Sequence, residues 1–202
     1  MALGCARSGA ISSTDPTPIP VVRRPAPPQS GPAANPALYD AAKGTVTEDD
    51  LDRLRQRMLA VPVVGKYPSD VADSFAEGRN GGRQHNAVDI MAPKGTPVVS
   101  ADDAVIRRLS SNVLGGITIY ATDADERFVY YYAHLDAYAP GLQVDQRVRR
   151  GDLLGYVGTT GNAPPNAPHL HFQITRLLDR DRLWDGVPID PKPFLQLPGA
   201  LR

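Results

Sequence analysis

All four histidines of this 202-residue chain lie in segments that also carry other groups able to bind a metal or move a proton. The segments are His85-Asn86-Ala87-Val88-Asp89, Tyr132-Ala133-His134-Leu135 and His169-Leu170-His171-Phe172. A catalytic zinc site needs three protein ligands from His, Asp, Glu or Cys, and an open position where water becomes a nucleophile. His85, Asp89 and His171 would supply the ligands. His134 and His169 then remain to handle protons.

The first of these segments is weak evidence for a metal site, and the last is stronger evidence. A single histidine followed four residues later by an aspartate is a weak signal. In the last segment, the apolar residues Leu170, Phe172 and Ile174 alternate with His169, His171 and Gln173. This alternation is typical of a strand, so both imidazoles project from one face. Packing alone does not readily explain two neighbouring imidazoles on one face.

The order of the motifs resembles that of a known family, the LytM/lysostaphin-type zinc metallopeptidases. These are bacterial enzymes with the duplicated-hybrid-motif fold that cut the peptide cross-links of peptidoglycan. The landmarks are, in order, Arg83-Gln84-His85 with Val88-Asp89-Ile90, Ala92-Pro93-Lys94-Gly95-Thr96-Pro97-Val98, Tyr132-Ala133-His134-Leu135, Val148-Arg149-Arg150-Gly151-Asp152 with Leu154-Gly155-Tyr156-Val157-Gly158-Thr159-Thr160-Gly161, and Pro168-His169-Leu170-His171-Phe172. The resemblance runs from residue 73 to residue 174.

Carried over to the matching positions, the resemblance implies that His85, Asp89 and His171 bind one zinc ion. It also implies that the catalytic residues His134 and His169 flank the attacking water and the developing oxyanion. Imidazoles at such positions can accept a proton, stabilise negative charge and return a proton to the leaving amine. The sequence leaves open which of the two performs which step.

Two positions depart from the family's pattern. Ala87 stands where the family usually has glycine, and Gln173 stands where it usually has glutamate. The first is a small change in volume, and the second lies outside the ligand set. Neither removes a group that the chemistry needs, so we expect an active site.

Length and charge exclude several classes of protein. The 22 basic and 22 acidic residues balance, whereas a nucleic-acid-binding protein normally has a basic excess on one face. No apolar stretch approaches the length of a membrane span. A chain of this length is expected to form one domain with an appendage, stable without disulfides. We expect a monomer.

The start of the chain resembles the end of a bacterial lipoprotein signal. In Met1-Ala2-Leu3-Gly4-Cys5, a cysteine follows a small residue, but the charged and apolar regions of a signal peptide are absent. We expect the true start to lie upstream, and lipidated Cys5 to attach the protein to a membrane of the bacterial envelope, in the periplasm, with the outer membrane as the candidate site. The alternative is an incidental cytosolic thiol.

Proline, serine, threonine and alanine dominate residues 11–36. This composition favours extended polyproline conformations and cannot bury a core. Residues 1–40 are therefore interpreted as the lipoprotein-like start followed by a disordered tether, and the alternative is a plain disordered tail.

A short helix is expected within residues 41–66, the helical lead-in. Thr47 is a plausible N-cap with acidic residues after it, and Leu51, Leu54, Met58 and Leu59 recur at helical spacing until Pro62. A packing helix is the favoured interpretation, and a helix that shields the cleft is the alternative.

Residues 67–197 are expected to form the peptidase domain, mainly β, as a single antiparallel sheet or sandwich. The expected strands are Val98-Val99, Ala104-Val105-Ile106, Ile117-Thr118-Ile119-Tyr120, Phe128-Val129-Tyr130-Tyr131-Tyr132 and Leu153-Leu154-Gly155-Tyr156-Val157. Glycine and proline on both sides of the segment from His85 to Asp89 break a helix, so a loop running into a strand is expected there.

Other residues near the motifs have assigned or open roles. Tyr130 and Tyr132 share one face of their strand while Tyr131 points to the other, and a tyrosine hydroxyl near the metal could bind substrate. The polar loop 159–168 is expected to form a wall of the substrate groove. Trp184 is expected to pack rather than to bind.

Three functions follow as hypotheses. The first is a zinc endopeptidase of peptidoglycan that cuts the D-alanyl-meso-diaminopimelate bond rather than a pentaglycine bridge. The second is a non-catalytic envelope protein that activates cell-wall amidases or binds peptidoglycan; such a protein should lack at least one of the five site residues, and all are present. The third is a zinc hydrolase of this fold that acts on a peptide outside the wall.

Overall fold

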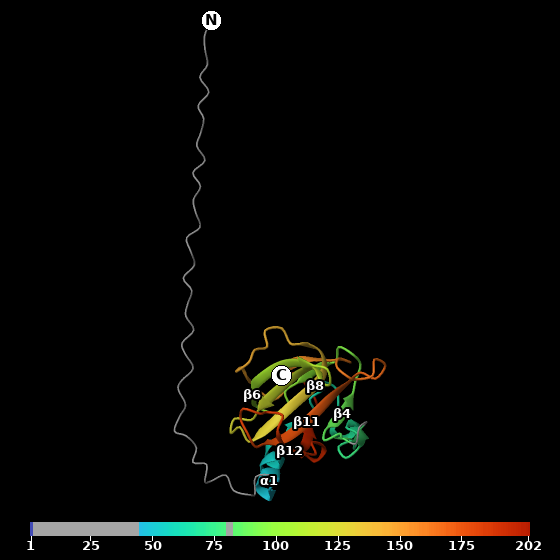
Figure 1. Cartoon of the computed structure of the whole chain (residues 1–202), viewed down its shortest axis with the longest axis vertical. Helices are drawn as coiled ribbons and strands as arrows, with labels where there is room; N and C mark the ends of the chain where they lie inside the picture. The colour runs from blue at the N-terminus through green and yellow to red at the C-terminus, as the bar shows by residue number, and fades with distance from the viewer. Residues whose placement is uncertain (2–44, 80–82) are drawn as a thin grey trace. The chain divides into compact units, whose positions relative to one another are not determined.

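The computed structural model describes residue 1 and residues 45–79 and 83–202 (Figure 1). The expected lipidated Cys5 and the expected tether lie outside the described residues. The elements are α1 (Glu48–Arg57), β1 (Leu59–Ala60), η3 (Pro68–Asp70), β2 (Gly78–Arg79), β3 (Arg83–Gln84), β4 (Val88–Met91), β5 (Pro97–Val99), β6 (Ala104–Asn112), β7 (Gly116–Thr122), β8 (Phe128–Tyr138), β9 (Arg147–Val148), β10 (Leu153–Val157), β11 (His169–Leu177), β12 (Gly186–Ile189), η4 (Lys192–Phe194) and β13 (Leu195–Leu197).

Antiparallel pairing builds the main sheet, as expected for a mainly β fold. Its strands follow the order β12-β11-β8-β7-β6-β9, and β4 pairs with the N-terminal part of β11. β10 pairs with β5 and with the C-terminal part of β8, so a second branch of the sheet begins at β8. β1 and β13 form a separate parallel pair. Figure 1 shows β6, β8 and β11 crossing the domain, with β4 beside β11.

The two faces of the main sheet differ in character. The inner face carries the core, with Tyr130, Tyr132 and Phe172 among its largest fully buried side chains. Strand alternation places Tyr131 and His171 on the opposite face, where both are partly exposed. The expected division of the three tyrosines is therefore confirmed, and the outer face of the sheet is left to carry the site.

The helix begins where the sequence predicts and ends earlier. Thr47 forms a capping box with Asp50, which satisfies backbone donors of the first turn. Met58 adopts a left-handed conformation with φ of 50° and ends the helix, whereas the apolar spacing predicted a helix up to Pro62. The helix stops there because the next residue, Leu59, is fully buried in the extended strand β1, which pairs with β13.

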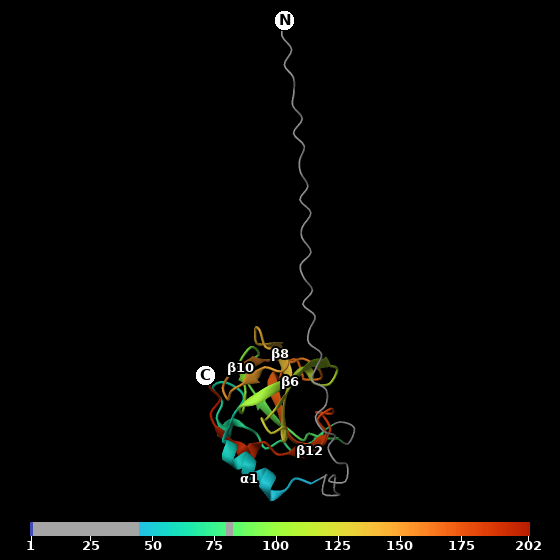
Figure 2. The same cartoon turned by 90° about the vertical axis from the view of Figure 1, so that its left-hand side faces the viewer.

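Ion pairs as well as apolar contacts fix α1 to the sheet. The fully buried carboxylate of Asp50 accepts hydrogen bonds from Arg127 Nε, just before β8, at 2.5 Å and from Arg176 Nε of β11 at 3.0 Å. Leu54 is buried in the same core as the sheet. Figure 2 shows α1 at the end of the domain near β12. Among the described residues, no helix is long and apolar enough to cross a membrane.

Candidate metal centre

A cavity of about 420 Å³ opens on the outer face of the main sheet. It is lined by Gln84, His85, Asp89, Leu114, Gly115, Tyr131, Ala133, His134, Asn162, Ala163, Pro164, His169 and His171. All five residues that the sequence singled out for chemistry are in this lining. Helix α1 contributes no residue to it, so the described helix does not shield the cleft.

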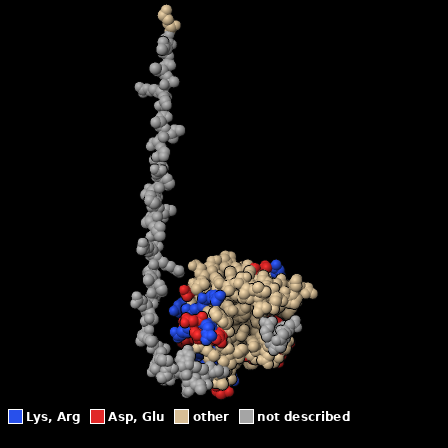
Figure 3. Space-filling model, in the orientation of Figure 1, with Lys and Arg blue, Asp and Glu red and all other residues tan. Residues whose placement is uncertain are grey.

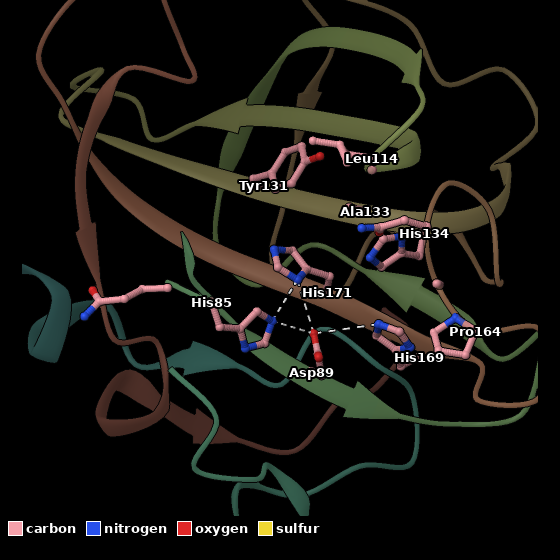
Figure 4. Close-up of a pocket in the computed structure, with 13 residues that line it drawn as sticks. His85, Asp89, Leu114, Tyr131, Ala133, His134, Pro164, His169 and His171 are labelled. Carbon is pink, nitrogen blue, oxygen red and sulfur yellow. Dashed lines mark hydrogen bonds and ion pairs between the residues drawn. The ribbon is translucent and has the colours of Figure 1, made fainter. Parts of the chain in front are cut away.

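Three of these side chains converge on one point (Figure 4). His85 Nε2 lies 2.9 Å from Asp89 Oδ1 and 3.0 Å from His171 Nδ1. His171 Nδ1 lies 3.2 Å from the same carboxylate oxygen. The structure thus brings together the three residues expected to bind the metal, although two come from one end of the domain sequence and the third from the other.

Strand pairing and one serine account for this convergence. Asp89 in β4 stands directly opposite His171 in β11, so their side chains leave the sheet on the same face. His85 precedes β4, and its Nδ1 donates to the carbonyl oxygen of Ser74 at 2.9 Å. The hydroxyl of Ser74 accepts a hydrogen bond from the backbone N–H of Asp89 at 3.2 Å. Ser74 therefore aligns two of the three side chains.

The three side chains fit the requirements of a zinc site. Their ligand atoms, two imidazole nitrogens and a carboxylate oxygen, lie within 4.8 Å of one another. This is a donor set of the kind that zinc prefers in catalytic sites. Because Nδ1 of His85 is committed to a backbone carbonyl, its Nε2 carries the lone pair that faces the cluster, as in metal sites whose histidines are oriented by a second hydrogen bond.

His134 reaches the cavity only because β8 is irregular there. Tyr131 and Ala133 face the cavity, so regular alternation would turn His134 toward the core. Instead, His134 has φ of 61°, a conformation uncommon for a residue other than glycine. The backbone N–H of His134 donates to the carbonyl oxygen of Gly115 at 2.7 Å, and the next residue, Leu135, is buried in the core. This local irregularity, which the sequence pattern does not reveal, delivers the imidazole to the site.

His134 and His169 are held in the same manner. Nδ1 of His134 donates to the carbonyl of Thr160, and Nδ1 of His169 donates to the carbonyl of Ala167, each at 2.8 Å. Their ring centroids are 4.9 Å apart, and His169 Nε2 lies 3.7 Å from Asp89 Oδ1. In both residues the other nitrogen, Nε2, is thus the one left with a lone pair for chemistry.

Burial governs the electrostatics of the cavity. It lowers the pKa of His134 to about 4, with the neighbouring imidazoles acting in the same direction, so this ring is neutral at pH 7. Burial also lowers the pKa of His171. For Asp89, burial opposes ionisation, but the neighbouring imidazoles of His171 and His85 outweigh it and hold the pKa well below its usual range. The cavity therefore presents one ionised carboxylate and the neutral imidazole of His134.

Further residues complete the walls of the cavity. The predicted groove wall in the loop 159–168 supplies Asn162, Ala163 and Pro164. Tyr131 packs its ring edgewise on His171, with centroids 6.0 Å apart. The turn between β6 and β7, which belongs to none of the predicted motifs, adds Leu114 and Gly115. Its signal in the sequence is the pair Gly115-Gly116 between two strands.

The structure contradicts the expected packing of Trp184. This side chain is 59% exposed, and the guanidinium of Arg108 lies 5.5 Å from its ring centroid. The residue is in the connection between β11 and β12, whereas its partner is in β6. The prediction failed because the sequence around Trp184 shows no periodicity from which its surroundings could be inferred.

Known proteins share the sequence and the fold of this domain. The model of peptidase family M23 matches residues 83–191, more than half of the chain. The L-Ala–D-Glu endopeptidase of Bacillus subtilis is 34% identical over 148 residues, which cover 71% of this chain and 44% of the relative. The peptidoglycan DD-endopeptidase ShyC of Vibrio cholerae is 31% identical over 118 residues, which cover 58% of this chain and 24% of the relative.

A solved structure agrees with these relatives. The catalytic domain of the antimicrobial peptidase lysostaphin from Staphylococcus simulans superposes with a TM-score of 0.50 at 29% identity, covering 71% of this chain and 96% of that domain. The chain spans less than half the length of the two curated relatives. The matched segment contains all five of the clustered site residues. The chain therefore belongs to peptidase family M23.

Proposed function

We propose that this protein is a zinc-dependent endopeptidase that hydrolyses peptide cross-links of bacterial peptidoglycan. One observation carries the proposal: two imidazole nitrogens and a carboxylate oxygen converge in a cavity beside two further imidazoles that are oriented by the backbone. The names of the relatives, an L-Ala–D-Glu endopeptidase and a peptidoglycan DD-endopeptidase, support peptidoglycan as the substrate.

His85, Asp89 and His171 would hold the zinc ion. When bound there, zinc supplies Lewis acidity, which makes water nucleophilic near neutral pH and polarises an amide carbonyl. The negative charge of Asp89 and the second hydrogen bond of His85 to Ser74 favour the binding of a cation.

His134 and His169 act as the proton-transfer pair in this proposal. Each offers Nε2 as a base, because Nδ1 donates to a backbone carbonyl. Once protonated, each ring can stabilise an oxyanion or return a proton to the leaving amine. The same carbonyls stabilise the charged rings, and they keep both imidazoles aimed at the reacting amide.

We further propose the D-alanyl-meso-diaminopimelate cross-link as the bond that is cut. The DD-endopeptidase relative supports this choice, as does the expected lipid anchor at Cys5, which suits an envelope with a thin wall. Muropeptide mass spectrometry after digestion tests it: cross-linked dimers should decrease while tetrapeptide monomers increase. Release of glycine peptides from a pentaglycine-bridged wall, with unchanged dimers, would contradict it.

The proposed attachment to the envelope has its own test. A precursor expressed from an upstream genomic start should fractionate with membranes and incorporate a fatty-acid probe, and Cys5→Ser should abolish the label. A soluble, unlabelled precursor would contradict the anchor and leave the peptidase activity unaffected.

Metal analysis combined with digestion of purified peptidoglycan tests the main proposal. We expect one zinc per chain, cleavage of the wall, and loss of both in His171→Ala. Chelation should stop cleavage and added zinc should restore it. If zinc-loaded protein leaves every wall intact, a role in activating amidases or an activity on peptides outside the wall becomes the better explanation.

A further inference from the structure

A bulge in β6 turns two successive arginines to the outer face of the sheet. The register between β6 and β7 shifts between Ile106 and Arg108. Ile106 is fully buried in the core, and Leu109 packs against the core as well. Arg107 donates to the hydroxyl of Thr122, and Arg108 stands opposite Tyr120. Such bulges redirect a side chain that regular alternation would place elsewhere.

The two arginines have different surroundings. Arg107 forms ion pairs with Glu126 and Asp145, and Glu126 also binds Arg180. Arg108 has no ion pair with any carboxylate of the described residues, and its guanidinium lies over the ring of Trp184. Figure 3 shows charged side chains of both signs gathered on one side of the visible face, beside β6 and β12. Glu126 and Asp145 are already paired with Arg107 or Arg180, and Arg108 is left available.

A row of side chains connects Arg108 to the metal centre. Arg108 of β6 stands opposite Tyr120 of β7, which stands opposite Tyr131 of β8, which stands opposite Gln173 of β11. The rings of Tyr120 and Tyr131 are 4.6 Å apart between centroids. Tyr131 lines the cavity and contacts His171. An unbroken aromatic surface thus runs from the cavity to the arginine.

We propose that Arg108, held by Trp184, binds a free carboxylate of the peptide substrate outside the cavity. Stacking on an aromatic ring fixes the plane of a guanidinium and leaves its N–H groups free to form a bidentate pair with a carboxylate. This assignment rests on the proposed peptidase function and adds a determinant of its specificity. The stem peptides of peptidoglycan carry such carboxylates, whereas a pentaglycine bridge has none along its length.

The spacing sets where that carboxylate lies in the substrate. Three strand spacings of about 4.8 Å separate β6 from β11, so the row spans roughly 14 Å. An extended peptide covers about 3.3 Å per residue. The carboxylate bound by Arg108 is therefore about four or five residues from the bond that is cut.

Trp184 makes the proposal testable without any turnover, because it is the only tryptophan of the chain. Tetrapeptide stems with free carboxylates, titrated into the full zinc-loaded chain, should change the fluorescence of Trp184. The same stems with amidated carboxyl groups should bind about tenfold more weakly. Arg108→Gln should weaken binding of the free acid about tenfold and leave binding of the amidated stem unchanged. Arg108→Lys should bind the free acid with intermediate affinity, since lysine retains the positive charge but lacks the planar guanidinium that forms a bidentate pair.

Arg149→Gln is the matched control, because Arg149 is also exposed but follows β9 and does not belong to the row of side chains that connects Arg108 to the cavity. With cross-linked dimers as substrate, Arg108→Gln should raise KM and leave kcat within about twofold. Equal binding of the free acid by Arg108→Gln and the parent protein, or an equal loss in Arg149→Gln, would overturn the assignment. A chain that binds the free acid through Arg108 but cleaves nothing would support the assignment and count against the peptidase function instead.

Discussion

Two buried or partly buried carboxylates, Asp50 at helix α1 and Asp89 in the cavity, are surrounded by nitrogen-bearing groups. Asp50 accepts hydrogen bonds from two arginines and from the backbone and hydroxyl of Thr47. Arginine carries its charge at every accessible pH, so this site is neutralised by the protein itself. Asp89 instead faces His85 and His171, whose imidazole nitrogens offer lone pairs, and burial lowers the pKa of His171.

The difference separates a structural ionic site from a functional one. Around Asp50, every partner is a donor, so no further ligand is required. Around Asp89, two acceptor nitrogens and an acceptor oxygen crowd together at 2.9 to 3.2 Å, an arrangement that a bound cation would stabilise. The identity of the partners is therefore more informative than the burial of the carboxylate.

The largest effect is expected from removing a ligand in the cavity. His171→Ala should release zinc and lower kcat/KM more than about 10⁴-fold, because two remaining ligands do not hold the metal in a catalytic frame. The melting temperature of the metal-free protein should change little. Metal analysis and digestion kinetics check this prediction. Retention of one zinc per chain by His171→Ala would remove the proposed distinction between the two carboxylate sites.

The next largest effect is expected at the other carboxylate. Asp50→Ala leaves Arg127 and Arg176 without their buried partner and should lower the free energy of unfolding by about 3 to 5 kcal/mol. Asp49→Ala is the control, because Asp49 pairs with arginines at the surface and its loss should cost less than about 1 kcal/mol. Denaturant unfolding measures both. Zinc content per folded chain should be the same in both variants.

A smaller effect is expected when a proton-transfer group is removed and the ligands are kept. His134→Asn should bind zinc normally and lower kcat about 10²- to 10³-fold. Asparagine is chosen because it tolerates the left-handed backbone at this position. If His134→Asn loses zinc as His171→Ala does, the proposed division between ligands and proton-transfer groups is wrong.

The smallest effect concerns the dependence of stability on pH in the metal-free protein. The pKa of His134 is about 4 in the folded chain, below the usual value near 6.5, so the unfolded chain binds more protons between these values. This residue should therefore cost stability as the pH falls from about 6.5 to 4, by roughly 1 to 3 kcal/mol. His134→Asn should show a shallower decline. Nuclear magnetic resonance of the His134 ring should find it neutral at pH 6.

Periodicity in the sequence predicted much of the fold. The strand from Leu153 to Val157 has the expected bounds, and the N-cap at Thr47 is confirmed. The expectation failed at Met58, where the helix stops early, and it did not include the bulge before Arg108. These departures depend on tertiary contacts, which a pattern of apolar residues does not encode.

The candidate site was predictable in its residue types but not in its construction. The family resemblance assigned the five residues, and the structure gathers them in one cavity. The support given by Ser74, and by the carbonyls of Thr160 and Ala167, was not predictable, because backbone groups occur at every position of every sequence. Trp184 was misjudged for a related reason, since its partner is distant in the chain.

At His134, the requirements of stability and of catalysis conflict, because the backbone is left-handed and the side chain is an imidazole. Glycine would adopt φ of 61° without steric cost, whereas histidine holds it at an expense of about 1 to 3 kcal/mol. A chain selected only for resistance to heat would therefore favour His134→Gly over His134→Ala, by about 1 kcal/mol. Neither substitution retains an imidazole, so thermal selection that ignored turnover would tend to erase the residue that chemistry requires.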